Sequence, residues 1–334
     1  MTLYVSSLGS RLGDLVVMLP IIDGLISRGD RVILVVRSPL QMEFAGFLTG
    51  LAGVIKEHEL ENATGREPGR LCNFFEDVNQ RNYGKRGSIP ISEYEKTTIG
   101  QRLNLACHEF GLALDDYELL GLHSLSFDYL PEYRNKVIFI PGATGSSKRW
   151  PVEHWLGLAD MLASSSLSPI VVGQPELCPD VAAIADGGVQ FVATPRLREA
   201  INIISSCKLV ISSDTGLMHL SVHQKKATVC IFNQLTSIWF RKYPHSYILA
   251  GDRCRPECLQ TADDVDLQFQ RSLDLHGPVA YERSIWQGED YVPCVQLMNR
   301  CTAAVYPAHV LRLLQEASLM GSPVPASASG FSSN

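Results

Sequence analysis

Three short segments combine glycine with charged or hydroxyl side chains, and each follows an apolar run: LGSRLGD at 8–14, PGATGSSKRWP at 141–151 and SSDTGLMH at 212–219. Glycine-rich turns leave backbone N–H groups free to meet an anion, most effectively where a helix begins. A carboxylate there can take a proton from a reacting hydroxyl, and a cation can stabilise a phosphate leaving group. Together the segments indicate a site that holds a phosphorylated ligand beside a base.

The first segment offers Asp14 as the base, and we expect Arg11 and Gly13 to contact the molecule that loses the proton. Gly13 lets other groups approach closely because it has no side chain. The structural alternative is that Asp14 only caps a helix N-terminus, a place that aspartate favours. The segment lacks the GxGxxG spacing of a dinucleotide fingerprint.

The second segment carries two cations, Lys148 and Arg149, together with the hydroxyl of Thr144. Backbone amides, hydroxyls and a point charge in one turn suit a diphosphate. We therefore expect Lys148 and Thr144 to bind the phosphorylated ligand. The alternative is that the two cations are solvated surface charges.

The third segment places Asp214, Thr215 and Gly216 at a strand-to-helix turn, with His219 in the first turn of the helix. The amides and the helix dipole favour a phosphate at such a turn. The alternatives are that Asp214 or Thr215 caps the helix and that His219 is structural.

The first element that must position these residues is a strand–helix–strand unit. Leu3–Ser7 reads as a strand, apolar residues at helical spacing follow it, Gly29 ends that helix, and Arg31–Val36 forms a strand buried on both faces. Pro20 lies inside the expected helix and should kink it. Gly69–Ser88 shows no clear period and reads as a loop or short helical excursion.

The second half alternates between strand-like and helix-like runs: VIFI, PVEHWLGLADML, PIVVG, the segment around Pro179 to Ala185, VQFVAT, LREAINIISS, KLVISS, GLMHLSVHQ and ATVCIF. Such alternation predicts a doubly wound parallel sheet of the α/β class. Ligands bind such sheets at the carboxyl ends of the strands. The second and third segments fall there.

The ordered combination LGD-x5-P, PGA-x4-KRWP and SDTG-x2-H resembles glycosyltransferase family 9, the heptosyltransferases, over roughly residues 4 to 232. The resemblance implies the GT-B fold, in which two Rossmann-like, doubly wound parallel-sheet domains face a cleft. It also implies transfer of a sugar, with heptose from ADP-heptose as the usual donor, to an acceptor hydroxyl. The sequence leaves open whether the acceptor is a glycan, a protein or a small molecule. That transfer inverts the anomeric carbon and needs no catalytic metal.

Carried over by motif position, Asp14 resembles the general base and Lys148 a ligand of the donor phosphate. Asp214, Thr215, Gly216 and His219 correspond to the turn that binds the sugar diphosphate. The chain departs from the family after its last clear strand, where it reads FNQLTS in place of a Gly-Pro-Thr-like turn. We expect Thr236 in that stretch to serve the nucleotide.

The expected domains follow from these elements. Residues 1–125 form an acceptor-binding domain, and residues 126–305 form a nucleotide-sugar-binding domain that includes a cysteine-bearing region at 254–301. Residues 306–320 form a C-terminal helix, and the small, polar residues 321–334 form a disordered tail.

Composition narrows the partners. The chain has 334 residues, 46% of them hydrophobic and 19% charged, with a net charge of -6. No diffuse basic field attracts nucleic acid, so we expect no general nucleic-acid binding. The N-terminus lacks the pattern of an export signal and no apolar run spans a bilayer. We expect a cytoplasmic protein, with peripheral membrane association left open.

Four of the nine cysteines, Cys254, Cys258, Cys294 and Cys301, form CxxxC followed by CxxxxxxC. Four thiolates can hold zinc or iron in a structural site, and the alternative is separate buried or free thiols. Two other functions stay open beside sugar transfer: a non-catalytic protein that binds nucleotide sugars, and a nucleotide-sugar epimerase of the same architecture.

Overall fold

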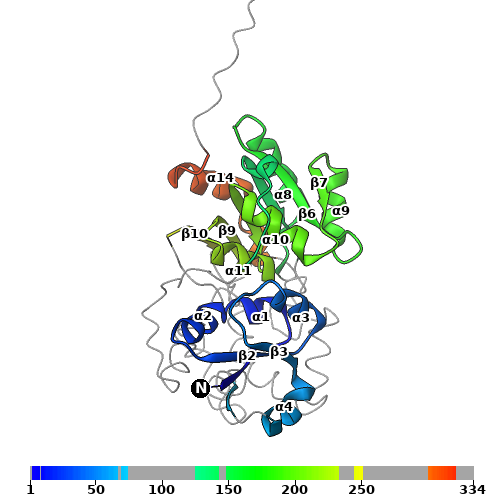
Figure 1. Cartoon of the computed structure of the whole chain (residues 1–334). Helices are drawn as coiled ribbons and strands as arrows, with labels where there is room; N and C mark the ends of the chain where they lie inside the picture. Colours follow the sequence, from blue (N-terminus) through cyan, green and yellow to red (C-terminus); the bar gives the residue numbers. More distant parts are fainter. Residues whose placement is uncertain are drawn as a thin grey trace, which may run out of the picture.

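The computed structural model describes residues 2–7, 9–66, 69–73, 125–142, 148–232, 244–250 and 300–320. These residues form two parallel β-sheets, each covered by helices, that lie one above the other in Figure 1. We call them the N-terminal sheet, drawn in blue, and the C-terminal sheet, drawn in green. Both belong to the α/β class that the alternating pattern predicts.

The N-terminal sheet has the strand order β3-β2-β1-β4, and all its described strands are parallel. Its elements in chain order are β1 (Thr2–Ser6), α1 (Leu12–Val16), α2 (Leu19–Ser27), β2 (Arg31–Val36), α3 (Pro39–Ala45), β3 (Gly53–Lys56), η1 (Glu57–Glu59), α4 (Leu60–Arg66) and β4 (Arg70–Asn73).

The C-terminal sheet has the order β10-β9-β8-β5-β6-β7, again all parallel. Its elements are η2 (Pro131–Tyr133), β5 (Lys136–Ile140), α8 (Val152–Leu162), β6 (Ser168–Gly173), α9 (Pro179–Asp186), β7 (Gln190–Ala193), α10 (Leu197–Ser206), β8 (Leu209–Ser213), α11 (Gly216–His223), β9 (Ala227–Phe232), β10 (Ser246–Ala250), α13 (Arg300–Ala303) and α14 (Pro307–Glu316).

Strand alternation explains why each sheet buries both faces. Leu3 and Val5 of β1 pack into one apolar cluster with α1, α2 and α3, while Tyr4 between them packs toward α4. In β5, Val137 and Phe139 face α8, α9 and α14, whereas Ile138 faces α10 on the opposite side. Near-continuous apolar runs are therefore required in these strands.

In each parallel sheet, successive strands are added first on one side of the starting strand and then on its other side, which defines a topological switch point. In the C-terminal sheet this point lies between β5 and β8, which pair directly through Ile140 and Ser212. In the N-terminal sheet β1 lies between β2 and β4. Because ligands bind open parallel sheets at such switch points, the loops after β1, β5 and β8 are the places to look for a site.

The expected kink at Pro20 is replaced by a break. The helical run divides into α1 and α2 around Val17 and Met18, and Pro20 lies in the first turn of α2. Proline is tolerated there because the first N–H groups of a helix have no intrahelical partner. Gly29 follows the end of α2 with φ +86°, as predicted for a terminating glycine.

Sequence periodicity missed the shorter strands. Arg70–Asn73 lies in the segment expected to be a loop, yet it forms β4 and pairs with β1. Gly53–Lys56 forms β3 and Ser246–Ala250 forms β10. A four-residue edge strand shows too few alternations for a periodic pattern to be read.

The two sheets are joined through one buried apolar cluster. Leu197 and Ile201 of α10 and Leu220 of α11 pack in the same cluster as Leu12 and Leu15 of α1. Figure 1 shows α10 and α11 facing α1 and α3 across this junction. The helices that begin after β1, β7 and β8 therefore share one core.

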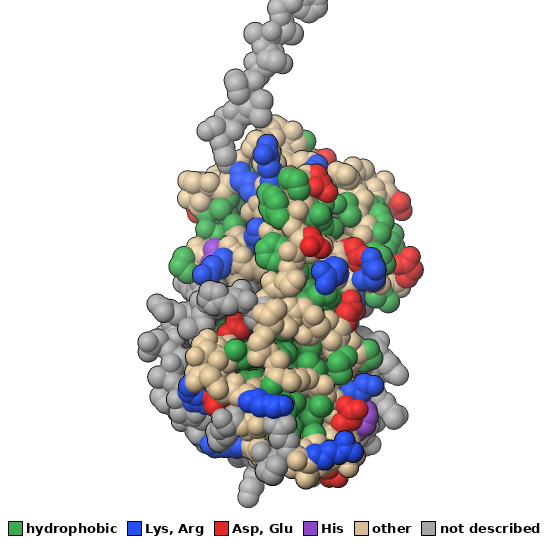
Figure 2. Space-filling view, viewed as in Figure 1, with side chains coloured by type: hydrophobic (Ala, Val, Ile, Leu, Met, Phe, Trp, Pro, Cys, Tyr) green, Lys and Arg blue, Asp and Glu red, His purple; other side chains and the backbone are tan. Residues whose placement is uncertain are grey.

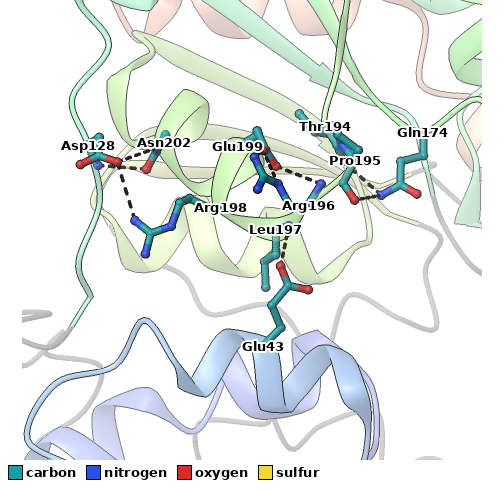
Figure 3. Close-up of polar contacts among 10 residues, drawn as sticks. All are labelled: Glu43, Asp128, Gln174, Thr194, Pro195, Arg196, Leu197, Arg198, Glu199 and Asn202. Carbon is teal, nitrogen blue, oxygen red and sulfur yellow. Dashed lines mark hydrogen bonds and ion pairs between the residues drawn. The ribbon is translucent and has the colours of Figure 1, made fainter.

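Polar contacts reinforce this junction (Figure 3). Glu43 on α3 accepts a hydrogen bond of 3.0 Å from the backbone N–H of Leu197, the first residue of α10. Asp128 lies at the other side of α10, where its N–H donates to Asn202 Oδ1 at 2.9 Å and its carboxylate is 3.7 Å from Arg198. A carboxylate from the N-terminal sheet thus caps a helix of the C-terminal sheet.

On the face shown in Figure 2, Lys and Arg side chains are scattered among acidic ones over both halves of the molecule. Among the residues that the structure describes, no helix is both long and apolar enough to cross a bilayer.

Candidate active site

The loops after β5 and β8 meet at the switch point of the C-terminal sheet. Lys148 Nζ lies 2.8 Å from Asp214 Oδ2, and both side chains are largely removed from solvent. This ion pair rules out the interpretation of Lys148 as a solvated surface charge. The second and third motifs are therefore parts of one site, with a cation held at the start of α11.

The turn before α11 is built from side chains with separate tasks. Thr215 is the N-cap of α11, and its Oγ1 accepts a hydrogen bond of 3.1 Å from Met218 N. The capping alternative thus holds for Thr215. His219 lies one turn further along, with Nε2 3.8 Å from Asp214 Oδ1. Asp214 consequently has a cation on one oxygen and an imidazole near the other.

Helix α1 meets α11 at a pair of glycines. A Cβ added to Gly216 would lie 2.9 Å from Gly13 N and 2.9 Å from Leu12 Cβ. A Cβ added to Gly13 would lie 3.2 Å from His219 Cδ2. Because both residues lack side chains, the first turns of the two helices touch. The first motif, next to the N-terminal sheet, thereby contacts the third motif, next to the C-terminal sheet.

Asp14 lies at the third position of α1, and the N-cap is Arg11. The alternative that Asp14 is the N-cap is therefore wrong, although its carboxylate completes a capping box from the third position. Its Oδ2 instead accepts a hydrogen bond of 3.0 Å from Arg11 N. A Cβ on Gly9 would collide with the same oxygen, so the loop before α1 closes tightly around the carboxylate.

The protein around Asp14 changes its proton affinity. Burial raises the pKa of the carboxyl, and the Asp214 carboxylate acts in the same direction. The backbone N–H of Arg11, its guanidinium and the Lys148 ammonium act to lower that pKa, and burial prevails. A carboxylate with a raised pKa is a stronger base than a solvated one, which suits proton removal from a hydroxyl.

Residues of all three motifs therefore lie together where α1 meets α11. They are Arg11, Gly13, Asp14, Lys148, Asp214, Thr215, Gly216 and His219. The arrangement offers a base on one side and a cation with a helix N-terminus on the other. Such a pair can deprotonate a nucleophile and stabilise a departing phosphate in one step. Glycine-to-glycine contact is the feature that motif reading missed, although the motifs contain both glycines.

Several expected site residues lie outside the described residues: Thr144, Thr236, Cys254, Cys258, Cys294 and the side chain of Cys301. Among the residues that are described, no group of three or more His, Cys, Asp or Glu side chains is placed to hold a metal ion.

Replacing Gly216 with alanine tests the contact between the helices. The added methyl must push α1 away from α11, and overpacking of this kind costs about 1–3 kcal/mol. We expect G216A to lower the free energy of unfolding by that amount in urea denaturation. Gly65→Ala is the matched control, because a Cβ there meets nothing within 4 Å and alanine favours the helix. Equal stabilities for the two variants would contradict the close approach.

The raised pKa of Asp14 predicts a pH-dependent stability. When the pKa of a carboxyl is higher in the folded than in the unfolded chain, the free energy of unfolding of the protein falls as the pH rises through the folded pKa. Asp14→Asn should therefore raise Tm at about pH 7, and the gain should shrink as the pH falls through the folded pKa of Asp14 toward the ordinary range of an aspartate, about pH 4. A Tm difference that does not depend on pH would show that burial does not control this carboxyl.

Sequence alignments with known proteins cover a limited part of this chain, whereas structural similarity covers most of it. Lipooligosaccharide heptosyltransferase 2 of Haemophilus influenzae is 28% identical over 103 residues, which is 28% of this chain and 30% of that relative. The chain is thus aligned with less than a third of that curated relative's length.

Solved structures show the fold. E. coli heptosyltransferase WaaC with ADP has a TM-score of 0.57 at 13% identity, covering 96% of this chain and 99% of that one. The iron-containing dodecameric glycosyltransferase TibC from enterotoxigenic E. coli H10407 has a TM-score of 0.58 at 13% identity, covering 95% and 76%. These neighbours confirm the expected GT-B architecture of two Rossmann-like sheets.

The model of glycosyltransferase family 9 (heptosyltransferase) matches residues 92–263, which is just over half of the 334 residues. That match includes the second and third motifs and the strands between them. The resemblance read from the three motifs is confirmed. The chain belongs to glycosyltransferase family 9.

Proposed function

We propose that this chain transfers heptose from ADP-heptose to an acceptor hydroxyl, with inversion at the anomeric carbon and without a catalytic metal. Family membership supports the class of reaction. The observation that carries the proposal is the position of Asp14 against the start of α11, beside the pair of Lys148 and Asp214. A base and a phosphate-binding turn from different sheets meet there.

The reaction that fits this arrangement is a single displacement. The acceptor hydroxyl gives its proton to Asp14 as its oxygen attacks the anomeric carbon, and the bond from that carbon to the diphosphate oxygen breaks. The electron pair of that bond leaves with the nucleoside diphosphate. Attack opposite the leaving group inverts the configuration, and the base and the phosphate site must lie on opposite faces of the sugar.

The leaving diphosphate develops negative charge, which fixed cations and amides stabilise. We assign that task to Lys148 and to the N-terminus of α11 at Thr215 and Gly216, with His219 beside them. Asp214 positions Lys148 for this task through the ion pair of 2.8 Å between Lys148 Nζ and Asp214 Oδ2. The ADP bound to the structural neighbour WaaC supports an adenine nucleotide. Contacts of Thr144 and Thr236 with the donor stay predictions.

The acceptor is proposed at the level of chemical class. The name of the Haemophilus influenzae relative supports a saccharide hydroxyl of a lipooligosaccharide. Arg11 and Gly13, beside the base, are assigned to the acceptor side. A cytoplasmic location and the absence of general nucleic-acid binding stay predictions from the sequence, as do the domain boundaries.

The four cysteines are proposed to hold a structural zinc or iron ion. Their spacing supports this, and the neighbour TibC is described as iron-containing. No step of the proposed displacement passes through that metal.

Donor selectivity tests the proposal. We expect ADP-linked compounds to raise the melting temperature more than GDP-, UDP- or dTDP-linked ones, since a ligand that binds the folded state stabilises it. ADP-heptose should then be consumed with release of ADP when an acceptor saccharide is present. Lys148→Ala should lower kcat/KM by about 100-fold or more, because a group that stabilises the leaving charge is lost.

Lys136→Ala is the matched control for that variant. Lys136 Nζ donates to Ser168 Oγ and Gln190 Oε1 at the amino ends of β5, β6 and β7, the sheet edge opposite to the site, so its loss should leave kcat/KM unchanged. Stabilisation by another nucleotide would refute the ADP-heptose donor. Saturable ADP-heptose binding without turnover would favour the non-catalytic alternative, and donor conversion without an acceptor would favour the epimerase.

A further inference from the structure

Gln41, on the first turn of α3, has a fully buried side chain in which every polar atom is engaged. Its Nε2 donates to Gly9 O at 2.7 Å and to Arg11 O at 2.8 Å. Its Oε1 accepts from Arg37 N at 2.9 Å. A buried amide that satisfies three backbone groups ties two separate loops together.

The partners fix the orientation of this amide. Two carbonyl oxygens require the NH2 group, and a backbone N–H requires the oxygen, so a flipped amide would lose all three bonds. Among the common side chains of this length, methionine supplies none of these bonds. Glutamate retains the acceptor and, when ionised, faces both carbonyl oxygens with negative charge. Glutamine is thus specifically required at the position.

The loop that Gln41 holds is the one that binds Asp14. Gly9 and Arg11 are the residues whose carbonyls accept from Nε2, and Arg11 N donates in turn to Asp14 Oδ2 at 3.0 Å. Ser7 adds to the same anchor, since its Oγ donates to Gly9 O at 2.6 Å. The buried amide and the carboxylate are therefore linked through the backbone of Arg11, which is hydrogen-bonded to Gln41 at its carbonyl and to Asp14 at its N–H.

We propose that Gln41 is a positioning residue for sugar transfer, which fixes the loop of residues 9–11 so that Asp14 faces the donor site with its hydrogen bond from Arg11 intact. This rests on the proposed function of Asp14 as the base. Gln41 acts through that loop and touches neither substrate.

Four charged or titratable groups lie around Asp14. Arg11 belongs to its own loop, while Lys148, Asp214 and His219 come from the C-terminal sheet. Gln41→Met leaves the last three in place and frees the loop that carries the first. Any change in the pKa of Asp14 in this variant should then come from the loss of the hydrogen bond from Arg11, because that bond stabilises the charged carboxylate.

The first test is a titration of the Asp14 carboxyl by carbon-13 NMR, with the signal assigned by its disappearance in Asp14→Asn. In Gln41→Met the pKa of Asp14 should rise by about one unit, since hydrogen bonds to the ionised form lower a carboxyl pKa. An unchanged or lowered pKa overturns the proposal. Ser7→Ala is the milder variant, with a smaller rise expected, and it serves if Gln41→Met does not fold.

The second test is kinetic. Gln41→Met should lower kcat by about 10- to 100-fold, because a misplaced catalytic group loses that much, and should leave the dissociation constant of ADP unchanged. The acid limb of the pH profile should move upward with the pKa. In the Asp14→Asn background the same change should have no further effect on the residual rate. An equal loss of rate in both backgrounds would show a merely structural role and overturn the proposal.

Gln174→Met is the matched control. Gln174 Nε2 also donates to two backbone carbonyls, Thr194 O at 3.1 Å and Pro195 O at 3.2 Å, but in the C-terminal sheet (Figure 3). It should alter neither the pKa of Asp14 nor the pH profile. A wild-type chain that transfers no sugar would contradict the proposed function, whereas the titration would still decide the role of Gln41.

Discussion

The contact between α1 and α11 is the constraint on which the candidate site depends. Gly13 and Gly216 allow two helices from different sheets to touch at their first turns. Any larger residue at 216 would meet the backbone of α1, and Asp14 would then lie further from the turn before α11. Leu12 and Leu15 of α1 and Leu220 of α11 belong to one buried apolar cluster, and their packing stabilises this contact.

Packing at this junction also sets the electrostatics. Bringing Asp14 under α11 removes water from its carboxyl, which raises its pKa, and it places Asp214 nearby with the same sign of charge. Lys148 offsets part of that repulsion because its ammonium pairs with Asp214 and also acts to lower the pKa of Asp14. Burial of this carboxylate thus costs stability and at the same time makes the group more basic.

Much of the fold can be predicted from the sequence, because strands that are buried on both faces appear in it as continuous apolar runs. The strands β5, β6, β8 and β9 and the helices between them follow from those runs. The short strand β4 could not be read, since Arg70–Asn73 has only four residues and begins and ends with a polar or charged one. Pro20 was read as a kink because pattern alone does not show where one helix ends and the next begins.

The site could be predicted in part for a different reason. Motif residues such as Asp14, Lys148 and Asp214 lie in the segments that follow the carboxyl ends of strands, and topology brings such ends together. Gln41 carries no comparable signal. It follows β2 in a helix without a motif, and its importance arises from three backbone groups contributed by two loops. Contacts of that kind exist only after the chain has folded.

The measurement that tests the account most directly is a crystal structure of the chain with ADP bound. The account predicts the diphosphate at the N-terminus of α11, within hydrogen-bond reach of Lys148 Nζ and the amides of Thr215 and Gly216, with Asp14 facing the β-phosphate. A nucleotide bound elsewhere, with the pair of Lys148 and Asp214 undisturbed, would contradict the assignment of this junction as the active site.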